Sequence, residues 1–311
     1  GVRAAGDVRR SPRPAHGLAH GLVLGLLALA GTAGAGAAAM GLGDALVLGV
    51  VEGITEYLPV SSTGHLILTQ RALGIPASEA ANAFAIAIQA GAIAAVLWLY
   101  RERVGAMLRG VAGRDAAGRG LAVAILVAFL PAAVVGLGLE DWIEARLFGL
   151  VPIVLAWFAG GVAILLVVRR GWADPRAPGR GVLEVTPPMA LGIGLMQCLA
   201  LWPGTSRSLV TILGGMLAGL TLVAAVEFSF LLGLVTLGAA TAWKALHAGP
   251  AMLEAYGAGA LLAGFLASAV SAAVAVRWLV DWLSRRGLGI FGAYRIALAL
   301  AVAALLWAGF L

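Results

Sequence analysis

The sequence predicts an all-α integral membrane protein with six transmembrane helices and two re-entrant helical hairpins. Hydrophobic residues make up 61% of the 311 residues and charged residues only 12%, whereas soluble domains carry about 25% charged residues. Six apolar runs each approach the ~20 residues that a helix needs to cross a bilayer. They lie at residues 84–100, 121–139, 150–168, 221–243, 252–276 and 290–310. Helices are expected because a spanning segment must satisfy its own backbone hydrogen bonds.

Residues 1–39 are expected to be a leader or N-terminal extension. Four arginines precede an apolar stretch, rich in alanine and glycine, from residue 17 to residue 39. This pattern fits a signal peptide, an additional span or an upstream extension of the reading frame. Because Met40 resembles a natural start, residues 40–311 are expected to form a single polytopic domain.

Three arginine-rich loops define the expected orientation. Residues 101–119 contain five arginines, residues 169–180 four and residues 277–286 three. The positive-inside rule places these loops in the cytoplasm, so the six spans alternate and Leu311 lies outside. Because basic residues in membrane proteins are sorted by topology, the net charge of +6 does not indicate a nucleic-acid partner.

Two polar segments, residues 44–73 and 185–220, do not fit as simple spans, because each must begin and end on the same side. Each has a central proline and a cluster of polar residues. Irregular polar backbone at membrane depth is tolerated only where protein buries it or where it lines a cavity. We therefore expect two re-entrant hairpins, the first entering from outside and the second from the cytoplasm.

The two halves of the chain, about residues 40–168 and 184–311, resemble each other. PVSS at residues 59–62 matches PGTS at residues 203–206, and AAV…DW at residues 132–142 recurs with the same spacing at residues 272–282. A unit of one hairpin and three spans crosses the membrane an odd number of times, so the copies are expected to form an inverted-topology repeat. Such repeats, with discontinuous elements meeting near the midplane, are typical of transporters.

Two carboxylates mark the first hairpin as a candidate functional site. Glu52 and Glu56 are four residues apart and share one face of a helix. Ionisable groups inside a membrane usually serve function, although a helix end at the interface would let both face water. Buried together, the two groups either share a proton, with one pKa raised, or bind a divalent cation through oxygen ligands.

Hydroxyl groups and an imidazole follow the helix break at Pro59 in the same hairpin. Ser61, Ser62 and Thr63 precede His65. One of the three hydroxyls is expected to cap the next helix. A serine and a histidine within reach of each other are the minimal arrangement of an activated nucleophile, so Ser62 and His65 are candidate catalytic residues.

The second hairpin supplies a candidate anion site around Arg207. A helix that begins after the Pro-Gly break would direct backbone N–H groups at an anion, and a guanidinium group matches phosphate with two hydrogen bonds. The alternative is a salt bridge from Arg207 to Glu52 or Glu56, which a substrate would displace. The hydroxyl-bearing neighbours of Arg207 are Thr205, Ser206, Ser208 and Thr211.

The two hairpins together suggest hydrolysis of a phosphorylated lipid. Acidic and basic groups would face a phosphate clamp inside a membrane, and binding alone would not require the glutamate pair and His65. The competing hypothesis is a membrane transporter or flippase of an isoprenoid phosphate or small anion, because inverted repeats favour alternating access. A homodimer is one assembly that the sequence leaves open.

LGVVEGITEYLPVSSTGHL at residues 48–66 and QCLALWPGTSRSLVTILGGM at residues 197–216 resemble the bacterial undecaprenyl-diphosphate phosphatases, a family associated with bacitracin resistance. The resemblance runs from about residue 40 to the C-terminus. It implies hydrolysis of undecaprenyl diphosphate to undecaprenyl phosphate and inorganic phosphate, which recycles the lipid carrier of cell-wall synthesis. It also implies a location in the bacterial inner membrane, with the active site open to the outer face.

The same resemblance assigns roles to individual residues. Glu52 and Glu56 match the essential acidic pair, which would hold Mg²⁺ or Ca²⁺, and Ser62, His65 and Arg207 match a nucleophile, a functional histidine and a phosphate-binding arginine. In one hypothesis Ser62 attacks phosphorus, with Glu56 as base or metal partner and His65 as acid or activator of water. In the other, Glu56 activates water directly. Substrate-binding roles are expected for Ser61, Thr63, Ser206, Ser208 and Thr211.

Overall fold

The computed structural model describes residues 40–311, so the leader or extension predicted for residues 1–39 lies outside the described residues. Apart from one isolated bridge between Arg180 and Leu220, the described residues form helices, turns and irregular segments, with no strand. Six helices among them are long and apolar enough to cross a membrane. They are Glu79–Leu99, Ala116–Leu139, Leu150–Arg169, Leu222–His247, Met252–Arg286 and Gly289–Trp307. The predicted all-α membrane fold with six spans is therefore confirmed.

The short helices form two pairs at the predicted hairpins. The first pair is α2 (Leu42–Thr55) and α3 (Ser62–Ala72), and the second is α8 (Pro187–Gln197) and α9 (Arg207–Leu217), with the 3-10 helix η3 (Cys198–Leu201) between them. The depth of the hairpins in a membrane stays a prediction. The remaining helices are α4 (Glu79–Leu99), α5 (Arg101–Val111), α6 (Ala116–Leu147), α7 (Leu150–Arg169), η2 (Val182–Glu184), α10 (Leu222–Arg286) and α11 (Gly289–Trp307).

Helix α10 contains two of the six spans and bends between them. Pro250 lies inside it, and Gly257 has φ 73° and ψ 160°, which interrupts the helical backbone. Proline removes a helical hydrogen bond, and glycine adopts positive φ without the clash that a Cβ atom would cause. The break at Gly257 falls inside the second predicted span, residues 252–276, so the uninterrupted helical backbone of that span begins after Gly257.

Three long helices begin at side-chain caps. Ser78 accepts a hydrogen bond from the N–H of Ala81 at the start of α4, and Thr221 accepts one from Ala224 at the start of α10. At the start of α6 the acceptor is Asp115. These residue types are favoured at such positions because their oxygen atoms satisfy N–H groups that have no partner within the helix. The local sequence thus sets where these helices begin.

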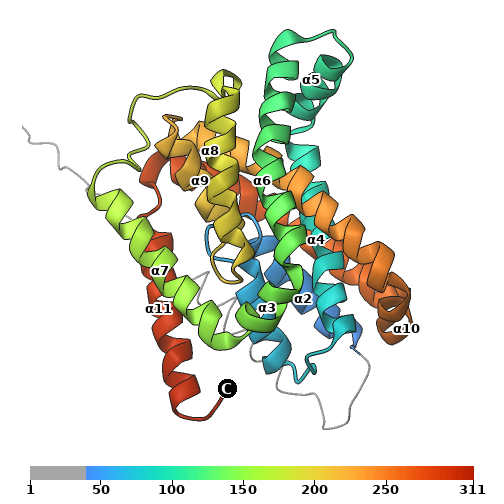
Figure 1. Cartoon of the computed structure of the whole chain (residues 1–311). Coiled ribbons are helices and arrows are strands. Elements are labelled where there is room, and N and C mark those ends of the chain that lie inside the picture. Colours follow the sequence, from blue (N-terminus) through green and yellow to red (C-terminus); the bar gives the residue numbers. More distant parts are fainter. Residues whose placement is uncertain (1–39) are drawn as a thin grey trace, which may run out of the picture. The chain divides into compact units, whose positions relative to one another are not determined.

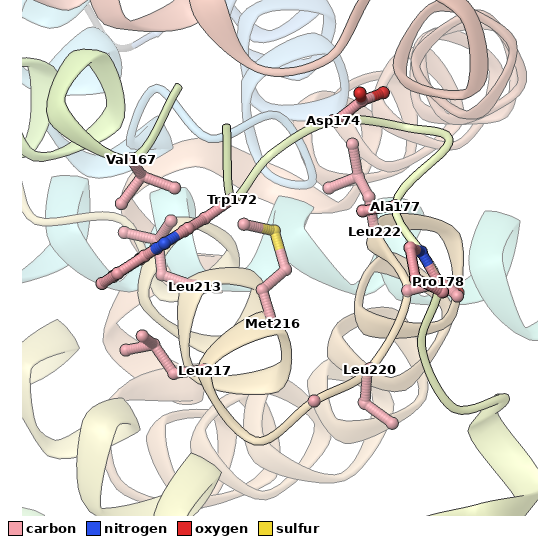
Figure 2. A pocket seen from close by; sticks show the side chains of 12 residues that line it. Val167, Trp172, Asp174, Ala177, Pro178, Leu213, Met216, Leu217, Leu220 and Leu222 are labelled. Carbon is pink, nitrogen blue, oxygen red and sulfur yellow. The ribbon is translucent and has the colours of Figure 1, made fainter. Parts of the chain in front are cut away.

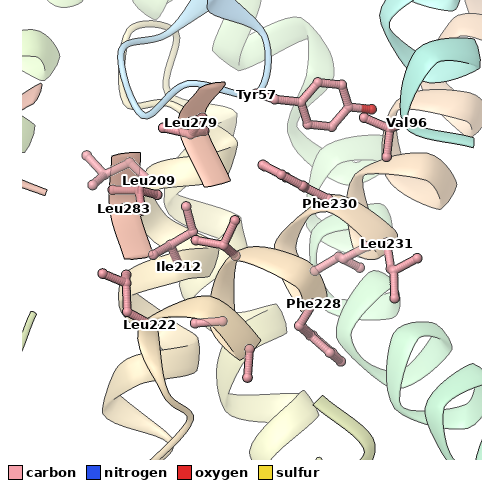
Figure 3. Packing of buried hydrophobic residues seen from close by; sticks show 14 of the residues in the cluster. Tyr57, Val96, Leu209, Ile212, Leu222, Phe228, Phe230, Leu231, Leu279 and Leu283 are labelled. Carbon is pink, nitrogen blue, oxygen red and sulfur yellow. The ribbon is translucent and has the colours of Figure 1, made fainter. Parts of the chain in front are cut away.

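Helix α10 is the main packing partner of α2 in the first hairpin. Helix α10 packs against α4 and α2, α7 packs against α11, and α8 packs against α9 and α6 (Figure 1). Figure 3 shows part of the main hydrophobic core, where the ring of Tyr57, which follows α2, lies above Phe230 of α10. The two ring centroids are 5.1 Å apart in an edge-to-face arrangement, a favourable geometry for aromatic pairs.

The three arginine-rich segments lie at one end of the helices. Arg101 and Arg277 place their guanidinium carbons 5.8 Å and 5.1 Å from the centroid of the same Trp98 ring. Arg103 forms an ion pair of 2.6 Å with Glu227 near the start of α10. Arg180 exchanges backbone hydrogen bonds with Gly219 and Thr221 at the same start. The predicted clustering of positive charge on one side is thus compatible with the fold.

Candidate active site

The carboxylates of the first hairpin lie on one side of α2, as their spacing predicts. Helix α2 ends at Thr55, but Glu56 keeps helical dihedral angles and its N–H donates to the carbonyl of Glu52 at 2.9 Å. Both residues are buried. The interpretation in which both carboxylates simply face water is therefore wrong for this structure.

Ser62, the first residue of α3, is bonded to Glu56. Its hydroxyl donates to Glu56 Oε2 at 2.5 Å. Hydrogen bonds to a carboxylate are short and strong because the acceptor is charged. The carboxylate is therefore positioned to take the proton of the serine hydroxyl. The sequence suggested His65 as the partner of Ser62. In the structure Ser62 bonds to Glu56, and His65 bonds to other groups.

Arg207, the first residue of α9, reaches the same carboxylate from the second hairpin. Its Nη2 lies 3.1 Å from Glu56 Oε1, and its Nη1 donates to the carbonyl of Ser229 at 2.9 Å. The guanidinium carbon lies 5.3 Å from the centroid of the Tyr57 ring. The alternative that the sequence allowed, a salt bridge between Arg207 and a hairpin glutamate, is present in the structure.

A glycine on α10 makes room for this guanidinium group. A Cβ atom at Gly233 would come within 2.6 Å of Arg207 Nη1. Real Cβ atoms do not approach so closely, so a larger residue would displace the arginine or the helix. The position of Arg207 is thus fixed by packing as well as by its hydrogen bonds.

The turns of the two hairpins share an unusual backbone conformation. Ser61 has φ 72° and ψ 102°, and Ser206 has φ 76° and ψ 112°. They are the non-glycine residues with positive φ in residues 40–311. Such conformations cost about 1–3 kcal/mol each and cluster at functional sites. The backbone angles therefore align Ser61 with Ser206. The sequence comparison of PVSS with PGTS aligned Ser62 with Ser206, so it is displaced by one residue from the structural alignment.

The hydroxyls of the second hairpin hold its turn in place. Ser206 caps α9 by accepting from the N–H of Leu209 at 3.3 Å, and it is 3.0 Å from Ser208 Oγ. Ser208 donates to the carbonyl of Leu58 in the first turn at 2.9 Å. Thr211 donates to the carbonyl of Arg207 at 2.8 Å. These contacts connect the two hairpins and leave substrate binding by the three hydroxyls as a prediction.

The hydroxyls of the first hairpin differ from the expected capping pattern. Ser61 occupies the cap position of α3, but its side chain makes no cap hydrogen bond. The expected side-chain cap is absent at this turn, where the hydroxyl of Ser62 is engaged by Glu56. Thr63 is half-buried, and its predicted contact with substrate stays a prediction.

His65 belongs to an aromatic cluster at the side of the hairpin. Its Nδ1 is 2.6 Å from the carbonyl oxygen of Ser61, and its Nε2 is 2.7 Å from the hydroxyl of Tyr294 in α11. The imidazole also stacks on Tyr294 and meets Trp157 edge to face. Both ring nitrogens are thus engaged, so His65 orients the turn next to Ser62 in this arrangement.

Sequence reasoning missed Arg295, a buried charge that connects both turns. Arg295 of α11 is fully buried. Its guanidinium group donates to the carbonyls of Gly204 and Ala156 at 2.9 Å each, and to those of Pro59 and Trp157 at 3.3 Å. A lone arginine inside a 19-residue apolar helix was the signal, because a charge at that depth needs polar partners.

Gln89 of α4 is a second residue that the sequence did not single out. Its amide nitrogen donates to Glu56 Oε2 at 3.4 Å, the oxygen that also accepts from Ser62. An amide inside the apolar helix Glu79–Leu99 was the available signal. Gln89 therefore completes the set of donors around Glu56, together with Ser62 and Arg207.

Glu52 fits a cation ligand. It is fully buried, and neither of its carboxylate oxygens has a hydrogen-bond partner within residues 40–311. A buried carboxylate with unpaired oxygens matches the preference of Mg²⁺ and Ca²⁺ for oxygen ligands. Residues 40–311 contain no cluster of three His, Cys, Asp or Glu residues, so protein ligands alone would not complete a coordination shell.

A cavity of about 330 Å³ lies away from these residues. Figure 2 shows its lining, which includes Trp172 and Pro178 of the loop after α7 and Leu213, Met216 and Leu217 of α9. Helix α9 rises 1.5 Å per residue, so Leu217 lies ~15 Å along the helix from Arg207. None of the predicted site residues lines this cavity, so it is not the catalytic pocket.

The assembled groups suit phosphoryl transfer. The Ser62 hydroxyl, the Glu56 carboxylate and the Arg207 guanidinium group are joined by direct hydrogen bonds across two hairpins that are far apart in sequence. A hydroxyl bonded to a base is the arrangement of an activated nucleophile, and the guanidinium group matches phosphate oxygens. The geometry therefore brings together Glu52, Glu56, Ser62 and Arg207, and it places His65 beside them with other partners.

Known proteins resemble this chain over most of its length. The family model of the bacitracin resistance protein BacA matches residues 45–301. The chain is 48% identical over 262 residues to the undecaprenyl-diphosphatase of Sorangium cellulosum. The aligned region covers 83% of this chain and 84% of that protein. It is 45% identical over 268 residues to undecaprenyl-diphosphatase 2 of Rhodospirillum rubrum, with 85% and 95% covered. Since the family match covers most of the chain, from within α2 to within the sixth span, the chain belongs to the BacA family of bacitracin resistance proteins.

Proposed function

We propose that this protein hydrolyses undecaprenyl diphosphate to undecaprenyl phosphate and inorganic phosphate. The observation that carries the proposal is the Glu56 carboxylate, which binds both the hydroxyl of Ser62 and the guanidinium group of Arg207. The relatives named above are undecaprenyl-diphosphatases, and their names give no support to a transporter. The reaction would return the lipid carrier to cell-wall synthesis and lower the amount of diphosphate lipid, in keeping with the bacitracin resistance of the family.

In the proposed first step, Ser62 Oγ attacks the terminal phosphorus atom. The Oγ–P bond forms while the bond from phosphorus to the bridging oxygen breaks, and undecaprenyl phosphate leaves. The hydroxyl proton passes to Glu56 Oε2, which is 2.5 Å away, and from there to the bridging oxygen of the departing undecaprenyl phosphate, so that Glu56 is a carboxylate again before the second step. Arg207 leaves Glu56 to bind the phosphoryl oxygens, where fixed positive charge stabilises the developing negative charge.

In the proposed second step, water attacks the phosphoserine and releases inorganic phosphate. Glu56 is the base for this water, and the proton that it accepts returns to Ser62 Oγ as the Oγ–P bond breaks. The alternative route, in which Glu56 activates water for direct attack on the diphosphate, uses the same groups without a covalent intermediate. His65 holds the Ser61 carbonyl beside the nucleophile.

Glu52 and Glu56 are proposed to hold a divalent cation together with the substrate phosphates. Mg²⁺ is commonly bound by one or two carboxylates plus substrate phosphates, which suits a site with few protein ligands. The bound cation would supply charge neutralisation at the phosphate oxygens. Glu52 supplies buried oxygen atoms that have no hydrogen-bond partner within residues 40–311.

The protein is proposed to lie in the bacterial inner membrane with its active site open to the outer face. The arginine-rich segments would lie in the cytoplasm. The turns that carry Ser62 and Arg207 would then meet inside the bilayer, within reach of a lipid diphosphate that arrives from the outer leaflet.

Phosphate release from undecaprenyl diphosphate by the purified protein tests the proposed function. We expect Glu56→Gln to lower kcat at least about a hundredfold, because general base catalysis contributes about that much. Glu254→Gln is the matched control, because Glu254 is exposed on α10. Absence of phosphate release by the unaltered protein, or normal release by Glu56→Gln, contradicts the proposal.

A further inference from the structure

A second cavity, here named the α4–α10 cavity, has a volume of about 210 Å³ and lies between two spanning helices. Helix α4 contributes Ala83, Ala87 and Ala90 to its wall, and α10 contributes Thr241, Lys244 and Ala245. The wall is almost entirely apolar. Small side chains on both packed helices leave the space open (Figure 1 shows α4 beside α10).

Hydrogen bonds connect the wall of this cavity to the candidate active site. The hydroxyl of Thr241 lies 3.4 Å from Gln89 Oε1, and the amide nitrogen of Gln89 donates to Glu56 Oε2 at 3.4 Å. A single side chain therefore separates the cavity wall from the central carboxylate. The site itself is enclosed, since the side chains of Glu56 and Arg207 are 5% and 9% exposed.

The surroundings of the cavity favour an apolar occupant from the bilayer. Ala245 is exposed at its edge, and Trp243 and Leu246, 48% and 79% exposed, flank it on α10. This part of α10 belongs to a spanning helix, so these side chains face lipid. A substrate with a charged head and a hydrocarbon chain needs an apolar passage of this kind to leave an enclosed polar site.

Lys244 gives the edge of the cavity a positive charge. It is half-buried, and no salt bridge to it is formed within residues 40–311. A lysine stem packs along apolar surface while its ammonium group reaches the polar edge. The charge therefore complements an anionic headgroup that arrives at the mouth of the cavity.

We propose that the α4–α10 cavity holds the isoprene units next to the diphosphate while the diphosphate occupies the Glu56–Arg207 site. Lys244 attracts the diphosphate to the mouth of the cavity. The proposal rests on the proposed function, because it names where the lipid part of that substrate binds. The larger cavity does not serve this role, because Leu217 in its wall lies ~15 Å along α9 from Arg207.

Filling the cavity tests the proposal by substrate chain length. We measure KM for undecaprenyl diphosphate and for methyl diphosphate, a short substrate without an isoprene unit, using Ala245→Trp and Ala242→Trp. Both alanines are exposed on α10, but only Ala245 lines the cavity. Ala245→Trp is expected to raise the ratio of the long-chain KM to the short-chain KM at least tenfold. A tenfold change corresponds to ~1.4 kcal/mol, or about two buried methylene groups.

The control variant Ala242→Trp is expected to leave this ratio unchanged. An unchanged ratio in Ala245→Trp overturns the proposal, as does an equal rise in both variants. Ala87→Leu, on the opposite wall, is the second variant and is expected to raise the ratio in the same direction. If the unaltered protein hydrolyses both substrates and only the ratio fails to change, the cavity proposal falls and the proposed function stands.

Lys244→Met tests the charge at the mouth of the cavity. Methionine keeps an unbranched apolar stem and removes the ammonium group. KM is expected to rise for both substrates at low ionic strength and to approach that of the unaltered protein at high salt, where charges are screened. A KM that stays the same at low ionic strength overturns the role of Lys244.

Discussion

At the scale of single residues, Glu56 is the common partner of groups from three elements. Ser62 of α3, Gln89 of α4 and Arg207 of α9 all place hydrogen-bond donors on its two carboxylate oxygens. A buried carboxylate is stable only when such donors satisfy it. A substrate that takes Arg207 away must therefore bring compensating interactions, which a diphosphate and a cation would supply.

The covalent route makes a specific prediction for Ser62. Ser62→Ala is expected to lower kcat about a hundredfold or more, because the attacking hydroxyl is lost. The measurement is the initial rate of phosphate release, together with trapping of labelled phosphate on the unaltered protein. Ser284→Ala, on an exposed part of α10, is the control. Full activity in Ser62→Ala would favour direct attack by water.

Residue spacing could predict the glutamate pair but not every partner. The four-residue spacing of Glu52 and Glu56 needs only helical geometry, and the fold has it. The partner of Ser62 depends on the turn at residues 56–61, whose positive φ at Ser61 no sequence pattern indicated. That turn directs the Ser62 hydroxyl back to Glu56, whereas His65 is held by Tyr294, 229 residues away.

At the scale of elements, α11 holds the two hairpin turns together. Arg295 donates to Pro59 in the first turn and to Gly204 in the second, and it also binds two carbonyls of α7. Gly160 of α7 leaves space for it, since a Cβ atom there would lie 2.3 Å from Arg295 Nη2. Arg295 is thus a positioning residue for Glu56, Ser62 and Arg207.

Replacing Arg295 is expected to affect both stability and turnover. Arg295→Met leaves buried turn carbonyls without donors, at a cost of about 1–3 kcal/mol for each. The Tm should fall, and kcat should fall more than KM changes, because the turns lose their relative position. Thermal unfolding in detergent and steady-state kinetics measure both effects.

Arg114→Met, at an exposed position, is the matched control for this substitution. Arg295→Lys should recover part of the kcat, because lysine retains the charge but cannot reach several carbonyls at once. Normal Tm and normal kcat in Arg295→Met would contradict the positioning role.

At the scale of the whole molecule, composition alone predicted most of the architecture. The apolar runs gave all six spans, because a span must be long and apolar. The boundaries moved where capping residues decide them, so the first span begins at Glu79 after Ser78 and not at residue 84. The paired short helices were predicted because each hairpin must begin and end on the same side of the membrane. Their contacts with Arg295 could be seen only in the structure.

Orientation can be measured with single cysteines. In a Cys198→Ser background, Trp307→Cys should react with an impermeant thiol reagent in intact spheroplasts, and Arg176→Cys only after the membrane is opened. Trp307 is 93% exposed at the end of α11, and Arg176 is exposed in an arginine-rich segment. The background protein is the control. The reverse labelling pattern would show that the arginine-rich side faces outward.

The two hairpin turns have nearly the same backbone conformation, but their hairpins carry side chains of opposite charge. Ser61 and Ser206 have nearly the same dihedral angles, yet the acids occur in the first hairpin and the arginine in the second. A symmetric pair of first hairpins would bring four carboxylates together, and a pair of second hairpins two guanidinium groups, each without counterions. Neither half could therefore assemble this centre by pairing with a copy of itself. Because charge is divided between the halves, the centre needs one hairpin of each kind.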